Sequence, residues 1–142
     1  MKPLLRFGLV LVLAGTASSC FFEDQSPDTL SFRLSGSPGS QVLAIYSTRF
    51  IAGINEIGGT EVRVFNSDSV IHTLPIDTTF SITVDQQFFV QIEPVDTVDV
   101  GARVDIDGRN VLNSEGFIFP DTPWRYVYQF NQLLTEIVEV VL

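Results

Sequence analysis

Hydrophobic and polar residues alternate along much of this chain, with the period of two that is typical of β-strands. In the segment 30–34, apolar side chains at every second position would face a core while the polar ones face solvent. The segment 41–50 is almost continuously apolar, which indicates a strand buried on both faces. Similar segments recur at 61–65, 70–74, 79–84, 88–93, 102–106, 109–112 and 124–130. This spacing predicts an all-β sandwich or barrel.

Turn-forming residues separate these segments. Gly36-Ser37-Pro38-Gly39 predicts a turn, and the glycine-rich stretch 51–59 predicts a loop. Polar residues at 66–69 and 85–87, and the Asp-Gly pair at 107–108, predict three hairpins. The Asp-Gly pair is the strongest of these signals, because both residues tolerate the positive φ angles of a tight two-residue turn.

The C-terminal segment 132–140 is open to two interpretations. Its apolar residues recur at helical spacing, but several of them are β-branched. β-Branched side chains favour strands, so a final strand is preferred to a helix.

The N-terminus has the pattern of an export signal. Lys2 and Arg6 precede an apolar run over 7–17, and three small residues, Ala17-Ser18-Ser19, stand immediately before Cys20. A membrane span would need about 20 apolar residues, and polar and acidic residues follow at once over 23–28. The junction resembles a bacterial lipoprotein signal, in which the cysteine is acylated and becomes the mature N-terminus. Ala17 stands where that pattern most often has leucine. An ordinary secretory signal cleaved nearby is the alternative.

The expected organisation is a lipoprotein signal peptide over 1–19, the lipidated cysteine and an acidic tether over 20–28, and a β-sandwich domain over 29–142. Removing 19 of the 142 residues leaves a chain of single-domain size. Cys20 is the only cysteine, so no disulfide would stabilise the fold. Losing Lys2 and Arg6 shifts the formal net charge from −9 to −11, which argues against nucleic acid as a partner. Palmitate-type acyl chains would hold the protein on the membrane instead.

The order of motifs resembles a known family. These motifs are the strand and turn at 30–39, a strand containing Tyr46, Leu74-Pro75, the segment 88–92, the hairpin 104–111 and Ser114-Glu115-Gly116. They are similar to the small sandwich domain of the mycobacterial MmpS-type membrane proteins and of related small lipoproteins. The resemblance covers 30–117, and Ile106–Val111 is its most specific part.

The resemblance has limits and implications. Ile76 and Asp77 stand where the family has an aromatic and a hydroxyl residue, the family's paired cysteines are absent, and the tail after 117 has no counterpart. What the resemblance implies is a non-catalytic partner of an envelope transporter. Together with the alternation it predicts a single immunoglobulin-like β-sandwich of about seven to nine antiparallel strands.

Candidate catalytic and metal-binding residues are sparse. His72 is the only histidine, and its neighbours on a strand predict an exposed position without a catalytic role. Four aspartates, Asp96, Asp99, Asp105 and Asp107, could hold Ca²⁺ or serve a glycosidase, but the ordered oxygen ligands of a calcium loop are missing. Beside Arg103 and Arg109, they are better interpreted as solubilising, edge-protecting charge. We therefore expect no enzyme, no metal and no cofactor.

The aromatic residues Trp124, Tyr126 and Tyr128 share one face of a strand. Facing outward, they would form a platform for a sugar or peptide; facing inward, they would belong to the core, and the core is preferred.

Two functions remain open. The preferred one is a lipid-anchored, non-catalytic envelope protein that binds a protein partner, such as a membrane transport complex. The alternative is a carbohydrate-binding surface lipoprotein that uses the aromatic face. Either would be anchored in the cell envelope, on the periplasmic face of the outer membrane or at the cell surface. Glu23 and Asp24 after the cysteine resemble a surface-export signal, but an acidic tether without routing content explains them equally well.

Overall fold

The computed structural model describes residues 26–54, 56, 58, 60–130 and 139–141, and every described element is a β-strand. The strands are β1 (Thr29–Gly36), β2 (Gln41–Ser47), β3 (Arg49–Ile54), β4 (Thr60–Phe65), β5 (Asp68–Thr73), β6 (Ile76–Ser81), β7 (Gln87–Pro94), β8 (Val98–Ile106), β9 (Arg109–Ile118), β10 (Trp124–Gln129) and β11 (Glu139–Val141). The predicted all-β class is confirmed. Residues 1–19, expected to be a signal peptide, and 20–25, expected to belong to a tether, lie outside the described residues.

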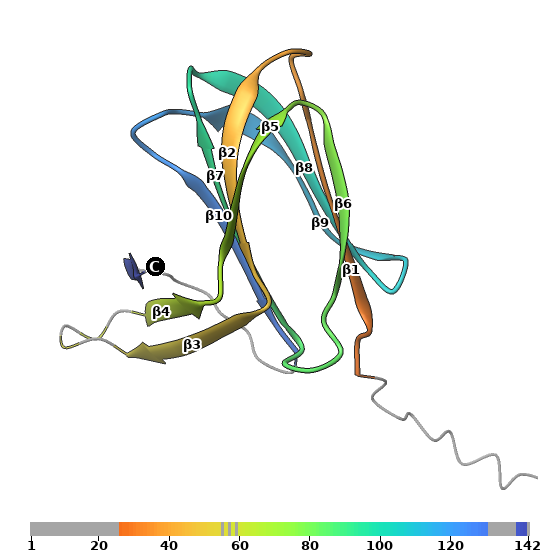
Figure 1. Ribbon diagram of the computed structural model, residues 1–142, viewed down its shortest axis with the longest axis vertical. Helices are drawn as coiled ribbons and strands as arrows, with labels where there is room; N and C mark the ends of the chain where they lie inside the picture. The colour runs from red at the N-terminus through yellow and green to blue at the C-terminus, as the bar shows by residue number, and fades with distance from the viewer. Residues whose placement is uncertain (1–25, 55, 57, 59, 131–138, 142) are drawn as a thin grey trace, which may run out of the picture.

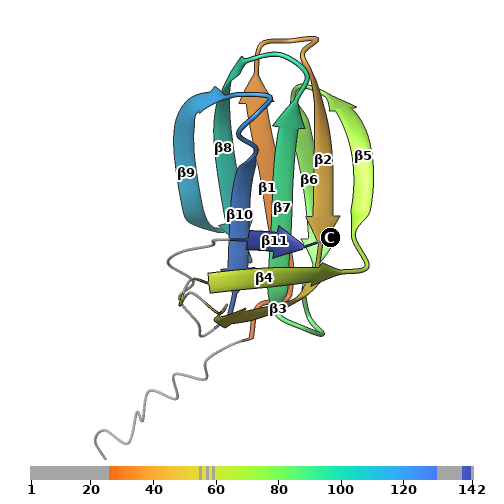
Figure 2. The ribbon, with the colours of Figure 1, turned by 90° about the vertical axis from the view of Figure 1, so that its left-hand side faces the viewer.

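The strands form two four-stranded sheets that pack face to face as a sandwich (Figure 1). The first sheet has the order β6-β1-β8-β9 and the second β10-β7-β2-β5, and both are antiparallel throughout. A smaller sheet, β11-β4-β3, crosses the outer face of the second sheet (Figure 2). The described strands outnumber the seven to nine expected, chiefly because residues 49–65 form this extra layer.

The main core fills the space between the two large sheets. The alternation over 30–34 is confirmed, because Leu30, Phe32 and Leu34 are fully buried. The Phe32 ring lies at the centre, with ring centroids 6.2 Å from Tyr46 and 6.1 Å from Trp124. Aromatic burial of this kind supplies stability that a chain without disulfides must obtain from packing.

A single bent hairpin produces the extra layer. Gln41 pairs with Thr73 at its base and Ile54 with Thr60 near its tip, and the same register runs through both halves. The bend falls at Ser47, whose hydroxyl accepts a hydrogen bond from the Arg49 N–H at 3.0 Å and lies 2.6 Å from the carbonyl oxygen of Phe65. The hydroxyl thereby ties the two strands together where the hairpin turns.

This arrangement corrects two predictions. Residues 66–69 do not form a hairpin turn, because β4 pairs with β3 and β5 pairs with β2. Asn66, with φ of 52°, instead forms part of the bend. Residues 51–54 are not a loop but the second half of β3.

Folding the hairpin back creates a second, smaller core. Phe50, Val62 and Val64 of the hairpin pack against Ile45 and Phe89 on the outer face of the second sheet. The strands β2 and β7 are therefore covered on both faces, as expected for the apolar run 41–50. That run is not one strand, however, because β2 ends at Ser47 and β3, in another sheet, begins at Arg49.

Of the other predicted turns and strands, some are present and others are not. Asp107 and Gly108, with φ of 47° and 77°, form the predicted tight turn between β8 and β9. The hairpin predicted at 85–87 is wrong, because β6 belongs to the first sheet and β7 to the second, and the connection crosses between them. The predicted late strand is present as β10. Of the tail, Glu139–Val141 forms the strand β11, parallel to β4, and 131–138 lie outside the described residues.

Tyr46 gives a test of the core. Its ring is buried, and its hydroxyl has no hydrogen-bond partner in the described part of the chain. An unsatisfied buried polar group costs about 1 to 3 kcal/mol. We expect Tyr46→Phe to raise the free energy of unfolding in urea by about 1 kcal/mol. The partly exposed Tyr128 is the matched control, and Tyr128→Phe should change stability by less than about 0.5 kcal/mol. A loss of stability in Tyr46→Phe would contradict the assignment.

Candidate functional site

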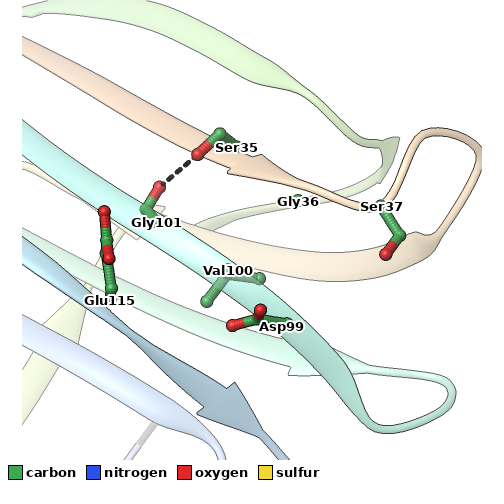
Figure 3. Close-up of a pocket in the computed structure, with 7 residues that line it drawn as sticks. All are labelled: Ser35, Gly36, Ser37, Asp99, Val100, Gly101 and Glu115. Carbon is green, nitrogen blue, oxygen red and sulfur yellow. Dashed lines mark hydrogen bonds between the residues drawn. The ribbon is translucent and has the colours of Figure 1, made fainter.

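A hollow of about 470 Å³ lies on the first sheet where β1, β8 and β9 meet (Figure 3). It is lined by Ser35, Gly36, Ser37, Asp99, Val100, Gly101 and Glu115. We call it the acidic hollow, because the only charged groups in its lining are two carboxylates.

Two glycines shape the acidic hollow. Gly101 pairs with Ser35 on one side and Glu115 on the other. A Cβ at Gly101 would lie 2.8 Å from the Ser35 hydroxyl oxygen, which donates a hydrogen bond to the Gly101 carbonyl at 3.1 Å (Figure 3). A Cβ at Gly36 would come within 2.9 Å of the Asp99 carbonyl oxygen. Any larger residue at either position would have to displace these neighbours.

The chemistry of the acidic hollow is that of a hydrogen-bond acceptor. The carboxylates of Asp99 and Glu115 come from adjacent strands and are both exposed, and Ser35 and Ser37 add hydroxyls. Carboxylates accept charge-assisted hydrogen bonds from guanidinium and ammonium groups. The hollow therefore suits a cationic side chain. Among the described residues, no group of three or more histidine, cysteine or acidic side chains is arranged to hold a metal ion.

The other candidate aspartates have structural roles. Asp105 is only 6 % exposed, so its interpretation as a solvated surface charge is wrong. Its carboxylate accepts hydrogen bonds from Arg103 Nε at 2.9 Å and from Asn110 Nδ2 at 3.1 Å, and lies 3.5 Å from Arg33 Nη1. The hydrogen bond from Arg103 is the main cause that holds the pKa of Asp105 below its usual value.

Asp107 fixes the start of the sandwich. Its carboxylate accepts hydrogen bonds from the Thr29 N–H at 2.9 Å and from the Thr29 hydroxyl at 3.0 Å, and more weakly from the Asp28 N–H. The backbone hydrogen bond from Thr29 is the main cause that lowers the pKa of Asp107. Asp99 and Asp107 lie at opposite ends of β8, so the four aspartates do not form one cluster; Asp96 is exposed in the connection before β8.

His72 and the aromatic strand face belong largely to the core. His72 is partly buried, not exposed as expected, and its ring packs edge-on against Tyr46 at 5.9 Å. Trp124, Tyr126 and Tyr128 pack against the main core, which confirms the preferred interpretation. Trp124 stacks on Phe32, and burial raises the pKa of Tyr126 to about 12. A sugar-binding function would need a surface other than an outward platform of these rings.

A second hollow, which we call the bend hollow, lies at the bend of the hairpin. No pattern in the sequence predicted it. It measures about 380 Å³ and is lined by Arg49, Phe50, Ile51, Phe65, Asn66, Asp85 and Gln87. Three segments far apart in sequence meet here only because the hairpin folds over the second sheet. No local pattern could have placed them together.

Comparison with known proteins adds no relative. Neither the family models nor the curated proteins give a match to the chain. Cys20 lies outside the described residues, and within the described ones no helix has the length and apolar character to cross a membrane.

Asp105 leads to a prediction about pH. A carboxylate whose pKa is lowered on folding stabilises the protein above its unfolded pKa of about 4, and that stabilisation is lost as the pH falls through the folded pKa. We expect Asp105→Asn to lower the urea midpoint at pH 7, and the difference from the unmodified chain to shrink and disappear as the pH falls from the unfolded pKa of about 4 through the lower folded pKa. Asp96→Asn removes an exposed charge and is the control. A deficit that is the same at every pH would contradict the ion-pair role of Asp105.

Proposed function

We propose that the chain is a lipid-anchored, non-catalytic binding protein of the bacterial cell envelope. Acyl chains on Cys20 hold it in the outer membrane, facing the periplasm or the cell surface. The observation that carries this proposal is the signal-like segment ending in Ala17-Ser18-Ser19-Cys20, placed nine residues before the first strand of a compact sandwich. A thiol at such a junction is the acceptor that lipoprotein processing uses.

The start of the domain suits a tether. Pro27 is buried, and the hydrogen bonds from Asp28 and Thr29 to Asp107 hold the chain at one end of the first sheet. Residues 20–28 can span at most about 30 Å when fully extended. A domain fixed at Thr29 therefore stays within that distance of an anchored Cys20.

The acidic hollow is the surface that such a protein offers a partner. Strand β1 begins at the tethered end with Thr29 and ends with Gly36 in the lining of the hollow. Its eight residues span roughly 25 Å, so the hollow opens at the end of the sandwich away from the tether. A basic segment of an envelope protein fits this position, since the chain is acidic overall and the lining described for the hollow has two carboxylates and no cationic side chain.

Replacing Cys20 tests the anchor. We expect the unmodified chain to sediment with membranes and to start, by mass spectrometry, with a diacylglyceryl-cysteine. Cys20→Ser should leave the membrane fraction, because it removes the acceptor of the acyl chain. Ser18→Ala keeps a small residue before the cysteine and should remain on the membrane. A mature unmodified chain without lipid would refute the proposal.

A pair of isosteric substitutions that neutralise both carboxylates tests the acidic hollow. Asp99→Asn with Glu115→Gln keeps the shapes of both side chains and removes two negative charges. Proteins that co-purify with the unmodified chain after cross-linking in intact cells should be recovered at least severalfold less well with this variant. Asp68→Asn with Asp85→Asn removes two exposed charges outside the acidic hollow, and this variant should still recover the same proteins. Equal recovery with both double variants would exclude the hollow as the docking surface.

A further inference from the structure

Apolar side chains project into solvent near the tethered end of the sandwich. Val84, in the connection between β6 and β7, is 87 % exposed, and Ile51 on β3 is 63 % exposed. Phe65, at the end of β4, is 43 % exposed and lines the bend hollow together with Ile51. We call Val84, Ile51 and Phe65 the basal residues.

Hydrogen bonds of neighbouring residues connect the segments that carry Val84 and Ile51 to the start of the domain. The Ile82 N–H donates to the Asp28 carbonyl at 2.9 Å, and the Gln86 N–H donates to the Ile82 carbonyl at 2.9 Å. The Phe50 N–H donates to Gln87 Oε1 at 3.1 Å. The 82–87 connection thus joins the chain start on one side to β3 on the other. Figures 1 and 2 show this connection and β3 at the end where β1 begins.

We infer that this end of the domain rests on the bilayer surface, with Val84 and Ile51 in contact with lipid. The inference depends on the proposed acylation of Cys20 and adds a second membrane contact, made by the folded domain itself. It also sets the orientation, because the acidic hollow then points away from the membrane.

The tether favours lipid as the occupant of the basal surface. Residues 20–28 confine the basal end to within about 30 Å of the lipid surface at all times. Such confinement acts as a high effective concentration, so a small apolar contact that would be negligible for a free protein becomes populated. Interfacial association scales with the apolar area inserted, and valine and isoleucine supply such area without a polar group to desolvate.

Electrostatics specifies the type of lipid. Arg49 and Asp85 both line the bend hollow, Arg63 opposite Ile51 forms an ion pair with Glu61, and Asp28 lies at the chain start. These groups together carry no excess of positive charge. With a net charge of −9 for the whole sequence, an anionic surface repels the domain. The contact should therefore form on neutral phospholipid and persist at high salt, unlike a contact made by a basic patch.

Two exposed valines at opposite ends provide a matched experiment. Val84→Cys and Val95→Cys each receive an environment-sensitive fluorophore on the full, acylated chain, in which the thiol of Cys20 is blocked by its lipid. Val95 is 67 % exposed in the connection between β7 and β8, beside the start of β2 at the far end. The proteins are reconstituted into phosphatidylcholine vesicles that contain nitroxide-labelled lipid.

The expected result is quenching and a blue shift at position 84 that exceed those at position 95 severalfold and do not change at high salt. Ile51→Cys should behave like Val84→Cys. Equal quenching at 84 and 95 on chains that float with the vesicles would overturn the inference and leave the anchor intact. Chains that do not float with the vesicles would overturn the proposed anchor, and this inference with it.

Discussion

Burial of the second sheet on both faces is the constraint that organises the rest of the molecule. The inner face of β2 and β7 packs against the first sheet, where Phe32 contacts aromatic rings from both strands. Their outer face carries Ile45 and Phe89, and an isolated sandwich would expose these side chains to water. Exposing large apolar side chains on an open sheet costs stability and invites association. The long hairpin over 41–73 removes that cost by folding its outer half across the face.

Most of the strands could be predicted from local patterns, but their pairing could not. Alternation located β1, and the Asp-Gly pair located the β8–β9 turn, because both signals depend only on neighbouring residues. The hairpins predicted at the polar stretches near Asn66 and Gln86 are wrong. Turn-forming residues show that the backbone can bend, but they do not show which strands pair beyond the bend. Both residues have a positive φ of 52°, yet neither joins two paired strands.

Candidate functional residues also differ in whether local sequence or strand pairing reveals them. The proposal for Cys20 depends only on the residues immediately around it. Asp105 is only partly accessible in this way. Its main partner, Arg103, is two residues away, but Arg33 lies 72 positions away in sequence and reaches the carboxylate only through the pairing of β1 with β8. The acidic hollow likewise requires Gly36 and Gly101 on adjacent strands. Once the register is known, such sites follow from it, whereas a single sequence contains no direct information on the register.

Strand β1 connects the two ends of the molecule and gives it a direction. At its start, the carboxylate of Asp107 in the β8–β9 turn accepts a hydrogen bond from the backbone N–H of Thr29. At its end, Gly36 and Ser35 form part of the acidic hollow against β8. The first sheet therefore joins the proposed anchor to the proposed docking surface through paired backbone and a packed core, so the two lie at opposite ends of one strand.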